Sequence, residues 1–375
     1  MIPIFRCARL AKFTPTLTTP LRTPTRTTRA SFATMSSTLD QVKSTFSQNL
    51  GGVAEKLTPA GQNFSIDDIP DLSGKVAIVT GGSEGIGYAC THTLLSKGVK
   101  KLYILSLSKD VVDGAKEAVA SELGQEKADA TEWIQLDISN WDKTIEVAKK
   151  LAAENERIDI LINNAGRGIM TMELTDKGVD RHMATNHMGH VLLTSYLLPT
   201  MKKTANAGNI VRIAGLASNT HEQSPKDTEF ESLAELNQDH GPLAQYGRSK
   251  LAVILYARWL ARHLTKEYPN ILASATHPGV VNTKMSTEDI HEPYPLAGYL
   301  MSTVARPFKK EPFEGALSTL YAATTTKNSG EYVCPPAAIE PGSELSRSTH
   351  LQDNLMRLTQ KVLKEQGGLE HVIFH

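Results

Sequence analysis

Short apolar runs alternate with longer amphipathic stretches along the chain from Lys75 onward. Val76-Ala77-Ile78-Val79 contains no polar residue and is bounded by turn-forming residues, a pattern typical of a strand that is buried on both faces. Similar runs predict further strands at residues 102–105, 132–136, 158–162, 209–213 and 271–276. Stretches with helical periodicity predict helices at residues 87–97, 111–123, 141–155, 179–201 and 246–264.

Strands and helices in this alternation predict an α/β fold. Parallel strands joined by right-handed helical crossovers form one sheet that has helices on both faces. We therefore expect a single Rossmann-type, doubly wound parallel sheet, built as one domain from residues 73–375. Residues 40–72 are predicted to form a short helix followed by a linker that contains Gly, Pro and Asp.

The first 39 residues differ in composition from the rest of the chain. They contain six Lys or Arg residues and many Thr, Ser and Pro residues, but no Asp or Glu. This composition is typical of a mitochondrial transit peptide and predicts a mitochondrial location. The alternative is a disordered tail without a targeting function, which would leave the protein in the cytoplasm. Four prolines in this segment favour the alternative, because proline restricts helix formation.

Charge and hydropathy argue against two classes of partner. Lys+Arg and Asp+Glu both number 40, so the chain beyond its basic first 39 residues is mildly acidic. Proteins that bind nucleic acid usually present a basic face, so we expect no nucleic-acid partner. No apolar run approaches the roughly 18 residues of a membrane-spanning helix, so we expect no transmembrane segment.

A glycine cluster, Thr80-Gly81-Gly82-Ser83-Glu84-Gly85-Ile86-Gly87, joins the first predicted strand to the next helix. Glycine lets the backbone turn sharply and approach a pyrophosphate, and the helix N-terminus offers free N–H groups to it. Turns also use glycine for steric reasons alone. At a strand-to-helix junction, however, the cluster predicts a dinucleotide site. The predicted contacts are Gly81, Ser83, Gly85, Ile86 and Gly87.

Tyr246 and Lys250 begin a later predicted helix, and their four-residue spacing places both on one face. Interconversion of a carbonyl and an alcohol needs a group that donates and accepts a proton near neutral pH. Free tyrosine has a pKa near ~10, and a neighbouring ammonium lowers that pKa by stabilising the phenolate. Such a pair is common on protein surfaces. Together with the glycine loop, it predicts a catalytic pair.

From Gly74 onward the chain resembles the short-chain dehydrogenase/reductase family of the classical type. Besides the glycine loop, the resemblance rests on Asn163-Asn164-Ala165-Gly166, Asn186-His187-Met188-Gly189-His190, Tyr246-Gly247-Arg248-Ser249-Lys250-Leu251-Ala252 and His277-Pro278-Gly279-Val280-Val281-Asn282-Thr283. The second and third of these segments resemble the retinol-dehydrogenase-like branch in particular.

The resemblance implies roles for residues in each segment. Tyr246 would donate or accept the proton, Lys250 would lower its pKa and bind the nicotinamide ribose, and Asn186 would anchor a water of the proton relay. The remaining cofactor contacts would come from Asn163, Ala165, Gly166, Val281 and Thr283, and from Asp137, which would contact the adenine.

The serine that would donate to the substrate oxygen needs a shifted alignment. The family usually has a Ser-Ser pair after the strand, and rigid counting from Asn209 places Ala214-Gly215 there. A shift of three residues, with extra residues near 206–209, matches Leu216-Ala217-Ser218-Asn219-Thr220-His221 to the Leu-Ser-Ser-Asn-x-His of some relatives. We therefore select Ser218; the alternative is that the catalytic serine has been lost.

The end of the second predicted strand bears on the choice of cofactor. An acidic residue there would bind the adenosine ribose hydroxyl and select NAD. Ser108 and Lys109 occupy this position instead and could receive a 2′-phosphate, which favours NADP. Glu84 and Asp110 argue mildly for NAD. Residues 290–310 are rich in aromatic and aliphatic side chains and predict a hydrophobic small-molecule substrate.

These residues predict an NADP-dependent oxidoreductase that interconverts a carbonyl and an alcohol. A dinucleotide-binding sensor or scaffold without turnover is the alternative from another class, and an epimerase or dehydratase is disfavoured by Glu84. No metal site is predicted, because His187, His190 and His221 lack a further ligand at suitable spacing. The sequence leaves a homodimer or tetramer open.

Overall fold

The computed structural model describes residues 64–281 and 310–367. The N-terminal segment 1–39, the short helix predicted after it, Thr283 and nearly all of the segment 290–310 lie outside the described residues. The predictions made for these segments therefore stay predictions.

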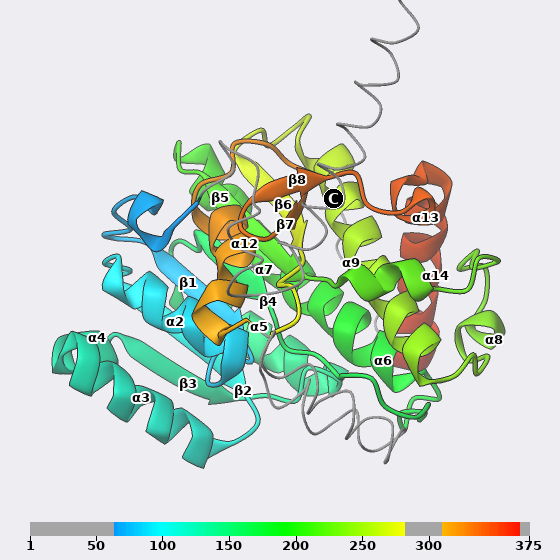
Figure 1. Ribbon diagram of the computed structural model, residues 1–375, viewed down its shortest axis with the longest axis horizontal. Helices are drawn as coiled ribbons and strands as arrows, with labels where there is room; N and C mark the ends of the chain where they lie inside the picture. Colours follow the sequence, from blue (N-terminus) through cyan, green and yellow to red (C-terminus); the bar gives the residue numbers. More distant parts are fainter. Residues whose placement is uncertain (1–63, 282–309, 368–375) are drawn as a thin grey trace, which may run out of the picture. The chain divides into compact units, whose positions relative to one another are not determined.

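One eight-stranded sheet runs through the described part of the chain, with the strand order β3-β2-β1-β4-β5-β6-β7-β8 (Figure 1). The strands are β1 (Val76–Thr80), β2 (Lys101–Ser106), β3 (Thr131–Gln135), β4 (Ile160–Asn163), β5 (Val211–Leu216), β6 (Ile271–Thr276), β7 (Tyr332–Cys334) and β8 (Ala338–Glu340). All neighbouring pairs from β3 to β7 are parallel, and only β8 pairs antiparallel, with β7. The predicted Rossmann-type, doubly wound sheet is confirmed.

Helices cover both faces of this sheet. On one face lie α2 (Gly85–Ser96), α3 (Lys109–Leu123) and α12 (Pro312–Thr324). Of these, α2 and α12 appear in front of the strands in Figure 1. On the other lie α5 (Trp141–Glu154), α7 (His190–Asn206), α9 (Pro242–Leu264) and α14 (Thr349–Gly367). The shorter elements are α4 (Gln125–Asp129), α6 (Arg181–Met183), α8 (Leu233–Leu236), α13 (Glu344–Arg347), the 3-10 turns η2 (Ile66–Asp68) and η4 (Asn219–Gln223), and the π-helix η3 (Ala184–Gly189).

The apolar run in β1 explains why both layers form. Successive side chains of a strand point to opposite faces. Ile78 therefore joins the core beneath α5 and α7, while Ala77 and Val79 join the core beneath α2 and α12. All five residues of β1 are buried, and its apolar side chains contribute to the cores on both faces of the sheet.

The structure differs from the predicted elements at three places that bear on the site. The helix predicted at 179–201 is divided into α6, the π-helix η3 and α7. The strand predicted at 209–213 ends three residues later, at Leu216. Helix α9 begins one turn before Tyr246, at Pro242, because proline is preorganised for the first position of a helix.

Candidate active site

A cleft of about 490 Å³ lies at the carboxyl ends of β1 and β4. These two strands are neighbours at the centre of the sheet, where the connection passes from one half to the other. Open α/β sheets bind ligands at this point. The cleft is lined by nine of the residues predicted to bind the cofactor: Gly81, Ser83, Gly85, Ile86, Gly87, Ser108, Asp137, Ala165 and Gly166.

The glycine loop lines the cleft and needs glycine for two distinct reasons. Gly81 and Gly85 have φ angles of +62° and +54°, a region that other residues rarely adopt. Gly87 is required because the backbone is closely approached there: a Cβ would overlap the carbonyl oxygen of Gly81 and lie 2.6 Å from Asn164 Nδ2. The loop therefore closes back on itself as helix α2 begins at Gly85.

Thr80 and Asn164 hold this loop in place, and sequence reasoning gave neither a role. Thr80 Oγ1 accepts hydrogen bonds from the backbone N–H groups of Asn164 and Ala165, both at 2.9 Å. The Asn164 amide donates to the carbonyl oxygens of Thr80 at 2.9 Å and Gly81 at 3.2 Å. These bonds join the ends of β1 and β4. The motif containing Asn164 was recognised, but its partner could not be seen before the strands were paired.

The two residues predicted to bind the 2′-phosphate of NADP follow the end of β2, and only one of them lines the cleft. Ser108 lines the cleft and caps helix α3, since its hydroxyl accepts from the Val111 N–H. Lys109 forms an ion pair with Asp113 one turn along the helix, and two thirds of its side chain (66%) is exposed. Lys109 is not among the residues that line the cleft. It would have to leave Asp113 to meet a phosphate there.

Two further predicted cofactor contacts face elsewhere. The side chain of Asn163 lies inside the protein, where its amide donates to Thr194 Oγ1 at 3.2 Å, and it does not line the cleft. Val281 is buried, pairs with Lys310 as an isolated bridge and packs against Gly315 of α12.

Tyr246 and Lys250 lie together on α9, as their spacing predicts. The ammonium nitrogen of Lys250 is 5.5 Å from the centre of the Tyr246 ring. Lys250 is 3% exposed, and its Nζ donates to the carbonyl oxygen of Leu216 at 2.7 Å. Burial lowers the pKa of Lys250 to about 8. Because Leu216 and Gly166 line the cleft and Gly166 adjoins Lys250, the amine lies at the edge of the cleft.

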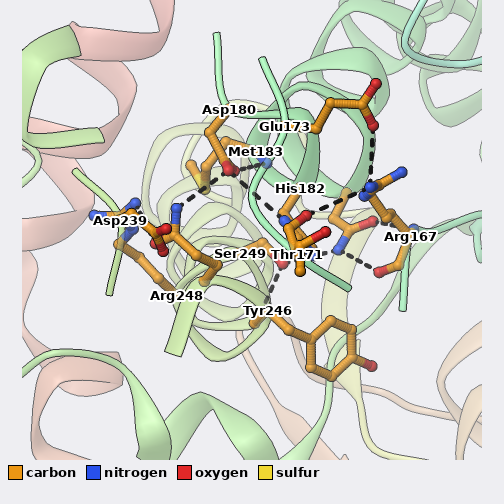
Figure 2. A network of polar contacts seen from close by, with 12 residues as sticks. Arg167, Thr171, Glu173, Asp180, His182, Met183, Asp239, Tyr246, Arg248 and Ser249 are labelled. Carbon is orange, nitrogen blue, oxygen red and sulfur yellow. Dashed lines mark hydrogen bonds and ion pairs between the residues drawn. The ribbon is translucent and has the colours of Figure 1, made fainter. Parts of the chain in front are cut away.

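Asn186 is the centre of a buried polar network that reaches α9. Its Oδ1 accepts from the Arg167 N–H at 2.7 Å, and its Nδ2 donates to the Arg167 carbonyl at 3.1 Å. The same Nδ2 donates to Ser249 Oγ at 2.8 Å, and Ser249 in turn donates to the Tyr246 carbonyl at 2.7 Å. Figure 2 shows Arg167, Ser249 and Tyr246 of this network, with the phenol of Tyr246 pointing away from the other labelled side chains. The Asn186 side chain thus fixes the segment after β4 to the helix that carries Tyr246.

Ser218 lies two residues beyond the end of β5 and begins the turn η4, where its hydroxyl accepts from the Thr220 N–H at 3.2 Å. Ala214 and Gly215, the alternative positions, are internal to β5 and pair with β4 and β6. Gly247 allows η4 to approach α9 closely, because a Cβ there would overlap the Thr220 carbonyl oxygen. Ser218 therefore follows a strand end that is in direct contact with Lys250 through Leu216.

Comparison with known proteins agrees with this geometry. The model of the short chain dehydrogenase family matches residues 75–225. The bli-4 protein of Neurospora crassa, a provisionally assigned mitochondrial oxidoreductase, is 49% identical over 98% of this chain and 89% of its own length. The short chain dehydrogenase/reductase dpchH of Colletotrichum higginsianum is 36% identical over 82% and 79%, respectively. This protein belongs to the short-chain dehydrogenase/reductase family.

The family assignment makes the protein an oxidoreductase of the short-chain class. Polyprenol dehydrogenase of Homo sapiens is 31% identical over 70% of this chain and 76% of its own length. Among solved structures, the NADP complex of RhlG from Pseudomonas aeruginosa aligns with a TM-score of 0.53 at 24% identity, covering 70% of this chain and 94% of that one. This likeness supports the fold.

Two kinds of feature are absent from the described residues. None of the helices in residues 64–281 and 310–367 is both long and apolar enough to cross a membrane. In the same residues, no cluster of three or more His, Cys, Asp or Glu side chains has an arrangement that could hold a metal ion.

Proposed function

We propose that this short-chain dehydrogenase/reductase uses NADP(H) to interconvert a carbonyl and a primary or secondary alcohol on a hydrophobic small molecule. Tyr246 is the proton donor or acceptor. The observation that carries the proposal is the position of Lys250, whose amine lies beside the Tyr246 ring and reaches the edge of the cleft at Leu216.

Each residue of the site has a separate task in this reaction. The hydride comes from the nicotinamide when the cofactor is bound. Tyr246 gives its phenolic proton to the carbonyl oxygen during reduction and takes it back during oxidation. Lys250 stabilises the phenolate that remains, because a buried ammonium interacts strongly with a nearby anion. Ser218 donates a hydrogen bond to the oxygen as negative charge develops on it.

The glycine loop and the start of α2 would hold the pyrophosphate. Helix α2 is 12 residues long, and its first turn, with the positive end of the helix dipole, lines the cleft. Asp137 would contact the adenine from the end of β3; its carboxylate already accepts from the Ser139 N–H and hydroxyl. The RhlG complex, whose bound cofactor is NADP, supports a nicotinamide dinucleotide in this fold.

The proposal is tested by cofactor titration followed by turnover. NADPH and NADH are titrated by fluorescence, and lipophilic aldehydes, ketones and isoprenoid alcohols are then assayed for cofactor oxidation or reduction. Binding with turnover supports the enzyme. Tight binding without turnover on any of these compounds would favour a sensor or scaffold, and absence of binding would overturn both.

We expect Lys109→Ala to weaken NADPH binding roughly tenfold and to leave NADH binding unchanged, since the variant loses a charge-assisted contact with the 2′-phosphate. Asp113→Asn should have the opposite effect, because it frees Lys109 from its ion pair. Lys116→Ala is the matched control, since that lysine on the same helix donates to the Thr131 carbonyl. An unchanged NADPH/NADH ratio in Lys109→Ala would return attention to Ser108.

Carbonyl reduction should decline as the pH rises through about 8, the pKa of buried Lys250. Below this pKa the amine carries the charge that stabilises the phenolate, and above it the charge is lost. Lys250→Arg keeps a cation far above this range, so its decline should shift to higher pH even if the rate is lower overall. Equal midpoints in the two pH–kcat profiles would show that Lys250 is not the titrating group.

The proposed substrate class rests on a relative, and the proposed location rests on another relative and on the composition of residues 1–39. The name of the human relative, polyprenol dehydrogenase, supports a long hydrophobic alcohol or its carbonyl counterpart as substrate. The name of the bli-4 relative supports a mitochondrial location, in line with the basic, acid-free composition of residues 1–39. Fusion of residues 1–39 to a fluorescent protein tests the location directly.

A further inference from the structure

His190 lies between the glycine loop and Asn186, and it has no part in the reaction described above. It is the first residue of α7 and is 4% exposed. Its Nε2 is 3.0 Å from Thr80 Oγ1 and its Nδ1 is 3.2 Å from the carbonyl oxygen of Asn186. The His190 ring therefore contacts both Thr80, the last residue of β1 before the glycine loop, and Asn186, which is hydrogen-bonded to helix α9.

The hydrogen-bond partners determine which nitrogen of the ring carries the proton. The Asn186 carbonyl can only accept, so Nδ1 must be the donor. Both lone pairs of Thr80 Oγ1 are taken by the N–H groups of Asn164 and Ala165. The single hydroxyl proton of Thr80 faces two acceptors, the ring Nε2 at 3.0 Å and the Ile162 carbonyl oxygen at 3.4 Å. In the shorter of the two contacts Thr80 donates and Nε2 accepts. Both contacts of the ring fit the same neutral tautomer, protonated on Nδ1.

The surroundings keep the ring neutral. Burial, reinforced by the charge of Lys250, lowers the pKa of His190 to about 4. A second proton on Nε2 would also lack an acceptor at Thr80. The neighbouring His187, which is equally buried, has its pKa lowered to about 3 by burial and by His190. The link between Thr80 and Asn186 is thus unchanged across the pH range in which the protein would work.

The π-helix explains why the Asn186 carbonyl can bind a side chain. In a regular α-helix the His190 N–H would donate to Asn186 four residues earlier. Here the π-helix η3 ends at Gly189, and the His190 N–H donates to the His187 carbonyl instead. The His190 ring donates to the carbonyl that its own backbone has released. Widened turns of this kind occur often at functional sites.

We infer that His190 is a positioning residue, which fixes the Asn186 backbone to Thr80 through an Nδ1-protonated imidazole and so couples the cofactor loop to the catalytic helix. The inference rests on the proposed function for its kinetic consequence only. Asn186 donates a hydrogen bond to Ser249, which donates to the backbone carbonyl of Tyr246, so a shift of Asn186 would displace Tyr246. Displacements of about 1 Å at such a site can reduce turnover by roughly 10²-fold.

The tautomer is tested without any assay of activity. In full-length protein labelled with ¹⁵N-histidine, His190 is assigned by its loss in His190→Asn. We expect one protonated and one unprotonated ring nitrogen, with the proton on Nδ1, and no titration between pH 6 and 9. A proton on Nε2, or a titration in this range, would overturn the inference whether or not the protein turns over any substrate.

The positioning role is tested by two substitutions at the same site. His190→Asn retains a donor close to the position of Nδ1, whereas His190→Phe retains the ring volume without a donor. We expect kcat to fall about tenfold or more in His190→Phe, with NADPH affinity changed less than threefold. In His190→Asn kcat should recover only in part, because the contact with Asn186 is kept and the contact with Thr80 is lost. Equal loss in both variants, or wild-type kcat in His190→Phe, would exclude the role.

His187→Leu is the matched control for loss of a buried histidine on the same turn. The His187 ring bonds to Thr359 of the C-terminal helix α14 at 2.8 Å, away from the cofactor loop. This variant should lower the melting temperature but leave kcat per folded molecule unchanged. The amount of folded protein is counted by NADPH-binding stoichiometry, so instability of a variant is not mistaken for loss of turnover.

Discussion

Tyr246→Phe should lower kcat by roughly 10²-fold or more, the usual scale for loss of a positioned proton donor. The substitution removes one hydroxyl from a side chain that is 9% exposed, so the fold and the ring contact with Lys250 should persist. NADPH affinity and melting temperature should therefore remain close to those of the wild type. The measurement is kcat at saturating cofactor, with binding and thermal melting on the same preparation.

Ser218→Ala separates the proton donor from the oxyanion donor. If Ser218 supports the developing charge, kcat should fall by about 10²–10³ with little effect on cofactor binding. Thr220→Ala, at a neighbouring position of the same turn, controls for local disturbance of η4. A dead Tyr246→Phe with a fully active Ser218→Ala would retain the mechanism and reject Ser218 as its serine. Near-normal turnover in Tyr246→Phe would reject the mechanism.

Gly87→Ala should weaken binding of NADPH and NADH alike by about 10- to 100-fold. The added Cβ would overlap the Gly81 carbonyl, so the loop must open before a pyrophosphate can be held. Overpacking of this kind costs about 1–3 kcal/mol, and each 1.4 kcal/mol is about a factor of ten in affinity. Titration of both cofactors, together with circular dichroism to confirm the fold, measures the effect.

Gly114→Ala is the control for this substitution. Gly114 lies within α3, and a Cβ there would meet nothing within 4 Å. Alanine is the better helix former by about 1 kcal/mol, so this variant should bind both cofactors normally and melt slightly higher. If Gly87→Ala bound NADPH as tightly as Gly114→Ala, the loop would not be the pyrophosphate site.

The strands and helices were predictable where the sequence pattern is local. The apolar run in β1 and the four-residue spacing of Tyr246 and Lys250 depend only on neighbours along the chain. The glycine loop was recognisable for the same reason. Strands β7 and β8 and helices α12 and α14 were not predicted. The two strands have only three residues each, and α12 follows residues 290–310, which were interpreted as a substrate-binding segment.

Sequence by itself determined the class of fold, the family and the placement of Tyr246 and Lys250 on one helix face, because each depends on a contiguous pattern. Only the tertiary structure decided which polar groups meet. The side chain of Asn163 points into the protein, and Asn164 makes the contacts to the glycine loop. Lys109 pairs with Asp113, and Lys250 donates to the Leu216 carbonyl. Hydrogen bonds between segments depend on strand pairing and helix packing, and spacing along the chain carries no information about them. The position of His190 between Thr80 and Asn186 is of this second kind, because its two partners are 106 residues apart and meet only when β1 and β4 lie side by side.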